Sequence, residues 1–203
     1  MQTTFRAIVS SLLIHSLLIS VLNVSTQANA DLPEVKQLVS NGLRTIDFAT
    51  DAGKVKVYLP DDMAAGDTIS GTVAAEPSAS GQLSGFVIDV AGNTSNLVDG
   101  RVKFTAPADS LTIVIRKGAV EAGRAAVSVA PRSTVSQLVF QLPTLGQQGR
   151  PIMVAGPFDG DISTTNCTVG NTPANVLAES PRQMILSSPA NVTGSSQLAV
   201  TEN

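Results

Sequence analysis

The sequence has few of the side chains on which enzyme catalysis usually depends. Its 203 residues include one cysteine, one histidine, one tyrosine and no tryptophan. With Cys167 alone, no intramolecular disulfide can form. A small buried residue on a strand is the simplest interpretation of this cysteine, and an intermolecular disulfide or a reactive thiol is the alternative. His15 lies in an N-terminal segment that we expect to be removed. The mature chain therefore excludes Ser-His-Asp and Cys-His catalysis and zinc sites built on His and Cys.

Charged residues are also scarce, and they do not cluster. The chain has 13 Lys and Arg against 16 Asp and Glu, a formal net charge of −3. This balance provides no basic surface for nucleic acid and no polybasic patch for a membrane. No segment after the N-terminus approaches the length of an apolar transmembrane run, so we expect no stable membrane insertion of the mature chain.

The N-terminus predicts export. Arg6 precedes a mostly apolar run over residues 7–24, and Ala28-Asn29-Ala30 has the small-x-small form of a signal-peptidase site. A membrane anchor is the alternative, but the run is short and interrupted by polar residues. We predict a signal peptide over residues 1–30 and a secreted, periplasmic or cell-surface protein.

Residues 31–44 contain the only helix candidate of the mature chain. Val35, Leu38 and Val39 recur at helical spacing, and Asn41-Gly42 suits a helix end. So short a helix is marginal in isolation. A short helix and a leader segment are equally compatible with this range.

From Thr45 onward the apolar residues alternate, which is typical of β-strands. Ile46 and Phe48 share one face, Val55, Val57 and Leu59 share the next, and Asp51-Ala52-Gly53 predicts a hairpin turn between them. Further strands are expected over residues 67–75, 83–90, 101–106, 110–117, 125–130, 135–142, 151–156, 166–171, 174–179, 183–188 and 196–202, with turns in clusters such as residues 91–95. We predict an all-β fold of two tandem immunoglobulin-like β-sandwich modules after the signal peptide, residues 45–131 and 132–203. Because the last strand ends one residue before the chain does, a truncated second module is an alternative.

Residues 143–202 resemble the immunoglobulin-like IPT/TIG domain family. The family pattern runs Gly-x-Phe, Val-Gly-Gly, Ala-x-Val, an apolar strand, Pro, Gly and a final apolar strand. The matching residues are Gly156, Phe158, Val169, Gly170, Ala174, Val176, Pro189, Gly194, Leu198 and Val200, and Asn171 stands where a second glycine is usual. The resemblance implies a β-sandwich and carries no activity.

Residues 45–131 look like N-terminal β-modules of large secreted bacterial proteins of unassigned function. This likeness implies a second β-sandwich and nothing chemical. Together with the general acidity and the lack of His and Trp, it favours a bacterial source.

Carboxylates are the remaining candidates for a site. Asp159 and Asp161 could bind calcium through oxygen ligands, with a loop carbonyl or Asn166 as a further ligand. Asp-Gly is also a common turn pair, and a plain turn is favoured. Asp61-Asp62 is interpreted as a solvated turn. The candidate acids for a hydrolase are Asp89, Asp99, Glu121 and Glu179, which lie in different strands or turns, and no spacing shows that any two converge.

The sequence therefore predicts a non-catalytic structural or protein-interaction module without a cofactor, whose partner is a protein or a cell surface. A calcium- or polysaccharide-binding module and an accessory domain of a longer secreted enzyme are the alternatives. The scarcity of surface aromatic residues counts against sugar binding.

Overall fold

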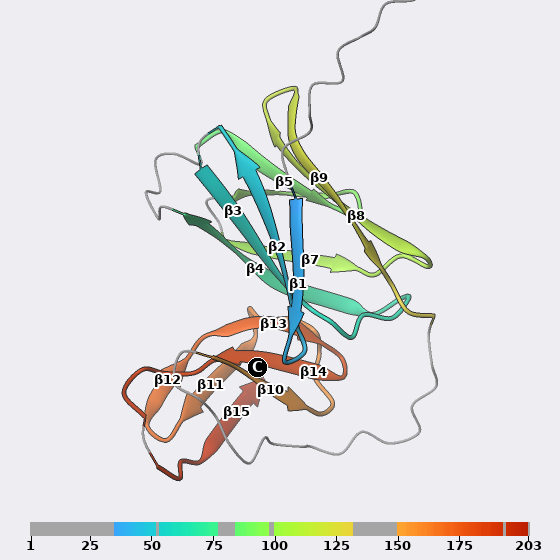
Figure 1. The fold of residues 1–203 in the computed structure, drawn as a ribbon. Helices are drawn as coiled ribbons and strands as arrows, with labels where there is room; N and C mark the ends of the chain where they lie inside the picture. Colours follow the sequence, from blue (N-terminus) through green and yellow to red (C-terminus); the bar gives the residue numbers. More distant parts are fainter. Residues whose placement is uncertain are drawn as a thin grey trace, which may run out of the picture. The chain divides into compact units, whose positions relative to one another are not determined.

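The fold is all β, as predicted. The computed structural model describes residues 35–51, 53–76, 84–97, 100–131, 150–192 and 194–202, and these contain no α-helix. The predicted signal peptide 1–30 and the predicted strand 135–142 lie outside the described residues. The strands are β1 (Val35–Ser40), β2 (Leu43–Thr50), β3 (Gly53–Pro60), β4 (Thr68–Glu76), β5 (Phe86–Val90), β6 (Asn93–Asn96), β7 (Arg101–Thr105), β8 (Ser110–Lys117), β9 (Val120–Ser128), β10 (Pro151–Ala155), β11 (Thr165–Val169), β12 (Thr172–Ala174), β13 (Val176–Ser180), β14 (Gln183–Ser187) and β15 (Leu198–Glu202) (Figure 1).

Residues 35–44 form a hairpin, in place of the helix or leader expected there. Strand β1 pairs antiparallel with β2 from Val35↔Phe48 to Ser40↔Leu43. Asn41 and Gly42 both have positive φ, 51° and 74°, as the two central residues of a type I′ hairpin turn require. The Asn-Gly pair that suited a helix end therefore closes a hairpin, because pairing with β2 overrides a short helical pattern.

Strand β6 lies in a segment that the sequence predicted to be a turn. The segment at residues 91–95, expected to be a turn, continues as strand β6, which pairs with β5 from Val87↔Asn96 to Val90↔Asn93. The turn itself is confined to Ala91 and Gly92, whose φ values are 51° and 81°. Polar residues at the edge of a sheet can pair as well as apolar ones. Such a strand lacks the apolar residues by which strands are predicted from sequence, so β6 was missed.

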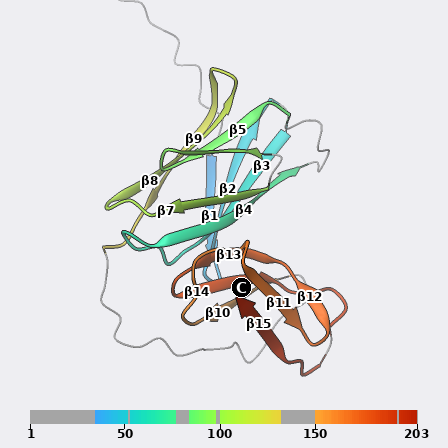
Figure 2. The same ribbon diagram turned by 180° about the vertical axis from the view of Figure 1, so that it is seen from behind.

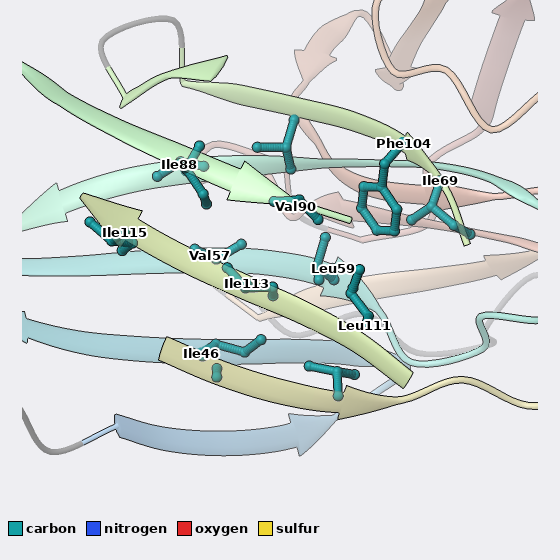
Figure 3. Packing of buried hydrophobic residues seen from close by; sticks show 14 of the residues in the cluster. Ile46, Val57, Leu59, Ile69, Ile88, Val90, Phe104, Leu111, Ile113 and Ile115 are labelled. Atoms are coloured by element: carbon teal, nitrogen blue, oxygen red, sulfur yellow. The ribbon is translucent and has the colours of Figure 1, made fainter. Parts of the chain in front are cut away.

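The first hydrophobic cluster lies between two sheets. Strands β2, β3, β4 and β7 bury one face against a four-stranded sheet in the order β6-β5-β8-β9. Figure 3 shows Ile46 and Val57 of the larger sheet packed near Ile113 of the four-stranded sheet. The alternation predicted in β2 and β3 is confirmed, since Ile46, Phe48, Val55, Val57 and Leu59 are all 0% exposed.

The second cluster uses the same large sheet. That sheet has eight strands in the order β1-β2-β3-β4-β13-β14-β10, with β7 also paired to β4. Its C-terminal strands pack against a three-stranded sheet, β12-β11-β15 (Figure 2). The cluster between them contains Val154, Phe158, Cys167, Ala174, Met184 and Leu186. One sheet therefore contributes to both of these clusters. A third, smaller cluster of Leu43, Ala178 and Ile185 joins the two predicted halves of the chain.

The two parts of the large sheet meet where β4 pairs with β13. Ser70 lies opposite Glu179, and Gly71 lies opposite Ala178. A Cβ atom at Gly71 would lie 2.1 Å from the backbone oxygen of Tyr58, so only glycine fits at this junction. Among the described residues, no helix is long and apolar enough to span a membrane.

Candidate functional site

Asp159 and Asp161 lie in the loop between β10 and β11, but the structure gives them different partners. Asp161 forms an ion pair with Lys103 of β7, and its Oδ1 accepts hydrogen bonds from the backbone N–H of Ser163 (3.0 Å) and from its hydroxyl (2.6 Å). The Lys103 ammonium, together with Ser163, lowers the pKa of Asp161 to about 2. The Asp161 carboxylate is therefore already neutralised by a protein cation.

Asp159 instead joins two glutamates that come from distant strands. Carboxylate oxygens of Asp159, Glu179 of β13 and Glu202 of β15 all lie within 4.8 Å of one another. We call these three residues the acidic cluster. Within the part of the chain that the structure describes, no ion pair joins any of the three to a lysine or arginine.

Backbone and hydroxyl donors hold each carboxylate of the acidic cluster in place. Glu179 Oε1 accepts hydrogen bonds of 3.0 Å from the backbone N–H groups of Gly160 and Asp161. Asp159 accepts at Oδ1 from Asp161 N–H (2.7 Å) and at Oδ2 from the Thr164 hydroxyl (2.8 Å). Glu202 Oε1 accepts from the N–H of Asp159 (3.2 Å). The cluster is therefore preorganised rather than a chance meeting of mobile side chains.

Glu179 is the unusual member of the acidic cluster. Its side chain is 0% exposed, and its Oε2 atom is buried without a hydrogen-bond partner. Burial raises the pKa of Glu179 to about 7, and the carboxylates of Asp159 and Glu202 raise it as well. A buried carboxylate oxygen without a partner is costly, so this group needs a proton or a cation.

The sequence pointed to Asp159 and, separately, to Glu179 as a candidate acid, but it gave no signal that these two residues meet or that Glu202 joins them. Glu179 is flanked by Ala178 and Ser180 in β13, which pairs with β4 and with β14. Glu202 reaches the cluster because β15 pairs with β11, where Glu202 lies opposite Thr165. Only these long-range pairings bring the three carboxylates together.

The other acidic candidates are engaged elsewhere. Asp61 and Asp62 form ion pairs with Arg44 and Arg182, both at 2.8 Å, so this turn is tied to two arginines rather than merely solvated. Asp89 lies 3.9 Å from Arg116. Glu121 pairs with Arg124 at 2.7 Å, while Asp99 lies outside the described residues.

Cys167 occupies the position predicted for it, a buried site on a strand. It is 5% exposed on β11, its thiol is free, and its Sγ lies 3.5 Å from the Met184 sulfur. Burial raises the pKa of the thiol to about 11, so the reactive thiolate is disfavoured.

A groove of about 940 Å³ is lined by other residues than those of the acidic cluster. Tyr58 of β3, Arg101 of β7 and Asn166 of β11 are among its polar residues, and the described residues that line it include no Asp, Glu or His. Leu43 and Leu177 supply part of its apolar surface. The described lining of the groove therefore offers binding contacts but no carboxylate or imidazole for acid–base chemistry.

Comparisons with known proteins assign no family. No protein-family model matches the sequence, and no curated protein matches it. One solved structure with a partial match is that of the Bacteroides ovatus mixed-linkage glucan utilization locus SGBP-B in complex with mixed-linkage heptasaccharide. It shares 14% identity, and the match covers 85% of this chain and 44% of that chain with a TM-score of 0.22. The chain thus spans less than half of that protein's length, and the TM-score is too low to indicate a shared fold.

Proposed function

We propose that the chain is a non-catalytic exported module that serves as a structural or protein-interaction element of the cell envelope or extracellular space. The observation that carries this proposal is the pairing of β4 with β13, through which one sheet serves both hydrophobic clusters. A sheet shared in this way fixes the orientation of the two halves through backbone hydrogen bonds. The predicted signal peptide and the IPT/TIG resemblance of residues 143–202 fit such a role.

Polar contacts reinforce the pairing of β4 with β13. The Thr72 hydroxyl donates to the backbone oxygen of Leu177 at 3.0 Å. The backbone N–H of Ile162 donates to Ser70 Oγ at 2.9 Å, in a buried position. These bonds run between segments more than ninety residues apart, so they hold the two halves as one unit that can space or present neighbouring elements.

Two features of the described residues favour a binding or structural role over hydrolysis. The groove has no carboxylate to act as acid, base or nucleophile. Glu179 has the raised pKa expected of a general acid, but its side chain is 0% exposed. A substrate bond cannot come within hydrogen-bond distance of this carboxyl group.

Backbone NMR relaxation tests whether the two halves act as one structural unit. We expect residues 43–131 and 150–202 to report the same rotational correlation time. Different correlation times for the two ranges would show independent halves and would contradict the proposed structural role. Small-angle scattering on the same sample independently measures how widely the distance between the two halves varies.

Polysaccharide binding is a second candidate, favoured by the position of Tyr58. The described phenylalanines, Phe48, Phe86, Phe104 and Phe158, are all buried. Tyr58 is only partly buried and lines the groove, where its ring presents a flat apolar face with a polar tip. Titration with soluble glucans should show binding that Tyr58→Ala abolishes and Lys54→Ala, on an exposed position of the same strand, preserves. Equal binding by both variants would exclude the groove as the sugar site.

A further inference from the structure

We infer that the acidic cluster of Asp159, Glu179 and Glu202 is a binding site for a divalent cation, with calcium as the best fit. The site differs from the Asp159–Asp161 pair that the sequence suggested, because Asp161 is neutralised by Lys103. It goes beyond the structural role proposed above and does not depend on it.

Geometry is the first argument. Oxygens that share one calcium ion at 2.3–2.6 Å lie at most about 5 Å apart. The three carboxylates offer oxygens within 4.8 Å of one another, which meets this limit. Calcium also accepts irregular arrangements of carboxylate oxygens, whereas magnesium demands a shorter, near-octahedral set.

The buried oxygen of Glu179 is the second, independent argument. Oε1 of Glu179 is held by the backbone N–H groups of Gly160 and Asp161 at 3.0 Å. Oε2 is buried and lacks any hydrogen-bond partner, although the side chain is 0% exposed. A cation among the three carboxylates supplies the positive charge that this oxygen lacks.

Charge balance points the same way. Among the described residues, Lys103 pairs with Asp161, and Arg182 pairs with Asp62 and Asp67, all outside the cluster. Two or three negative charges within 4.8 Å repel one another strongly when partly buried. A divalent ion removes this repulsion.

A cation at this site would join three segments of the chain. Glu202 lies at the end of β15, Asp159 lies in the loop after β10, and Glu179 lies on β13 opposite Ser70 of β4. A shared ion therefore ties β15, an edge strand of the three-stranded sheet, to the sheet that both hydrophobic clusters share. Calcium should protect β15 from local opening.

The test is calorimetric titration of the full chain with calcium chloride at pH 8, after removal of metals with EDTA. We expect saturable binding of one ion, with Glu202→Gln and Asp159→Asn each weakening affinity at least about tenfold. Glu121→Gln, whose carboxylate pairs with Arg124 away from the cluster, should bind as the wild type does. Glu202 is exposed, so Glu202→Gln should fold normally and keeps the test valid even if a Glu179 variant does not fold.

Hydrogen exchange locates the effect. Calcium should slow exchange at residues 198–202 in the wild type and leave it unchanged in Glu202→Gln. No binding at millimolar calcium would overturn the inference and would indicate that a proton shared between Glu179 and Asp159 satisfies the cluster. Binding lost in Asp161→Asn but kept in Glu202→Gln would also overturn it, in favour of the Asp159–Asp161 pair. Either outcome leaves the NMR test of the structural role unaffected.

Discussion

The guanidinium of Arg182 holds the carboxylate of Asp67, with Nη2 2.7 Å from Oδ2. The two side chains are 13% and 6% exposed. Arg182 lies in the turn between β13 and β14, whereas Asp67 immediately precedes β4. This ion pair therefore lies beside the β4–β13 pairing and joins the two halves of the chain.

Arg182→Met should destabilise the protein by about 3 kcal/mol, because removing one partner leaves the carboxylate of Asp67 buried and unpaired. Methionine keeps most of the apolar stem, so the change removes the charge together with its bonds to Asp67 and Asp62. Urea unfolding at pH 7 measures the loss. Arg124→Met, which breaks the exposed pair with Glu121, is the control and should change the free energy of unfolding little. Equal losses in both variants would exclude a special role for Arg182.

The pH dependence of stability should reveal Glu179. Its pKa is raised from 4.5 to about 7 in the folded protein, so the folded state binds the proton more tightly than the unfolded state. The stabilisation is full below about pH 4.5 and is lost as the pH rises to about 7; it amounts to about 3 kcal/mol at most. Unfolding in EDTA should show this decline in the wild type relative to Glu179→Gln, which has no proton to lose. Parallel pH profiles for the two proteins would contradict the raised pKa.

Gly160→Ala should disrupt the loop that carries Asp159. Gly160 has a φ of 79°, and a Cβ there would lie 2.1 Å from the backbone oxygen of Thr68. We expect a cost of about 1–2 kcal/mol for the left-handed backbone and about 1–3 kcal/mol for the clash. Gly92→Ala is the matched control, because Gly92 has a φ of 81° but no atom within 4 Å of its Cβ position. Thermal melts of both variants measure the two losses of stability. The loss in Gly92→Ala reports the backbone strain, and the additional loss in Gly160→Ala reports the clash.

A fragment of residues 31–131 should fold by itself, because it contains all buried members of the first hydrophobic cluster, from Ile46 to Val129. A cooperative melt of this fragment would support the predicted module boundary. Residues 132–203 should be less stable, since they lose the pairing of β13 with β4 and the ion pair of Lys103 with Asp161. An unfolded spectrum for residues 31–131 would mean that the two halves form a single folding unit.

The mature N-terminus should be Asp31. Cleavage after Ala30 follows from the small-x-small site and the preceding apolar run. Intact mass of the exported protein decides this, and a mass that includes Met1 would contradict the predicted signal peptide.

Alternation of apolar residues was enough to predict most of the strands. Ile46 and Phe48, then Val55 and Val57, alternate with polar neighbours, and all four are buried in the structure. This signal is reliable because side chains of a strand point alternately to opposite faces, so a half-buried sheet imposes a period of two. The turn at residues 51–53 was predicted on the same grounds, and Thr50 does pair with Gly53.

Local sequence was ambiguous where strands are short or polar. Val35, Leu38 and Val39 fit a helix as well as a strand, and pairing with β2 decided for a strand. Leu38 and Val39 are exposed at 67% and 45%, so the spacing of these apolar residues does not mark a buried face. Asn93 to Asn96 pair with β5 in a backbone ladder, and such a ladder forms with many residue types, so the residue types there did not indicate a strand.

The sequence by itself determined that this chain is built of strands, that histidine and an intramolecular disulfide are absent from its predicted mature form, and that Asp159 lies between strands. Tertiary structure alone decided that β4 pairs with β13 and that Glu179 and Glu202 meet Asp159. The reason is that a strand's faces follow from its own residues, whereas its neighbours in a sheet depend on backbone hydrogen bonds that any residue except proline can make. The acidic cluster is a product of such long-range pairings.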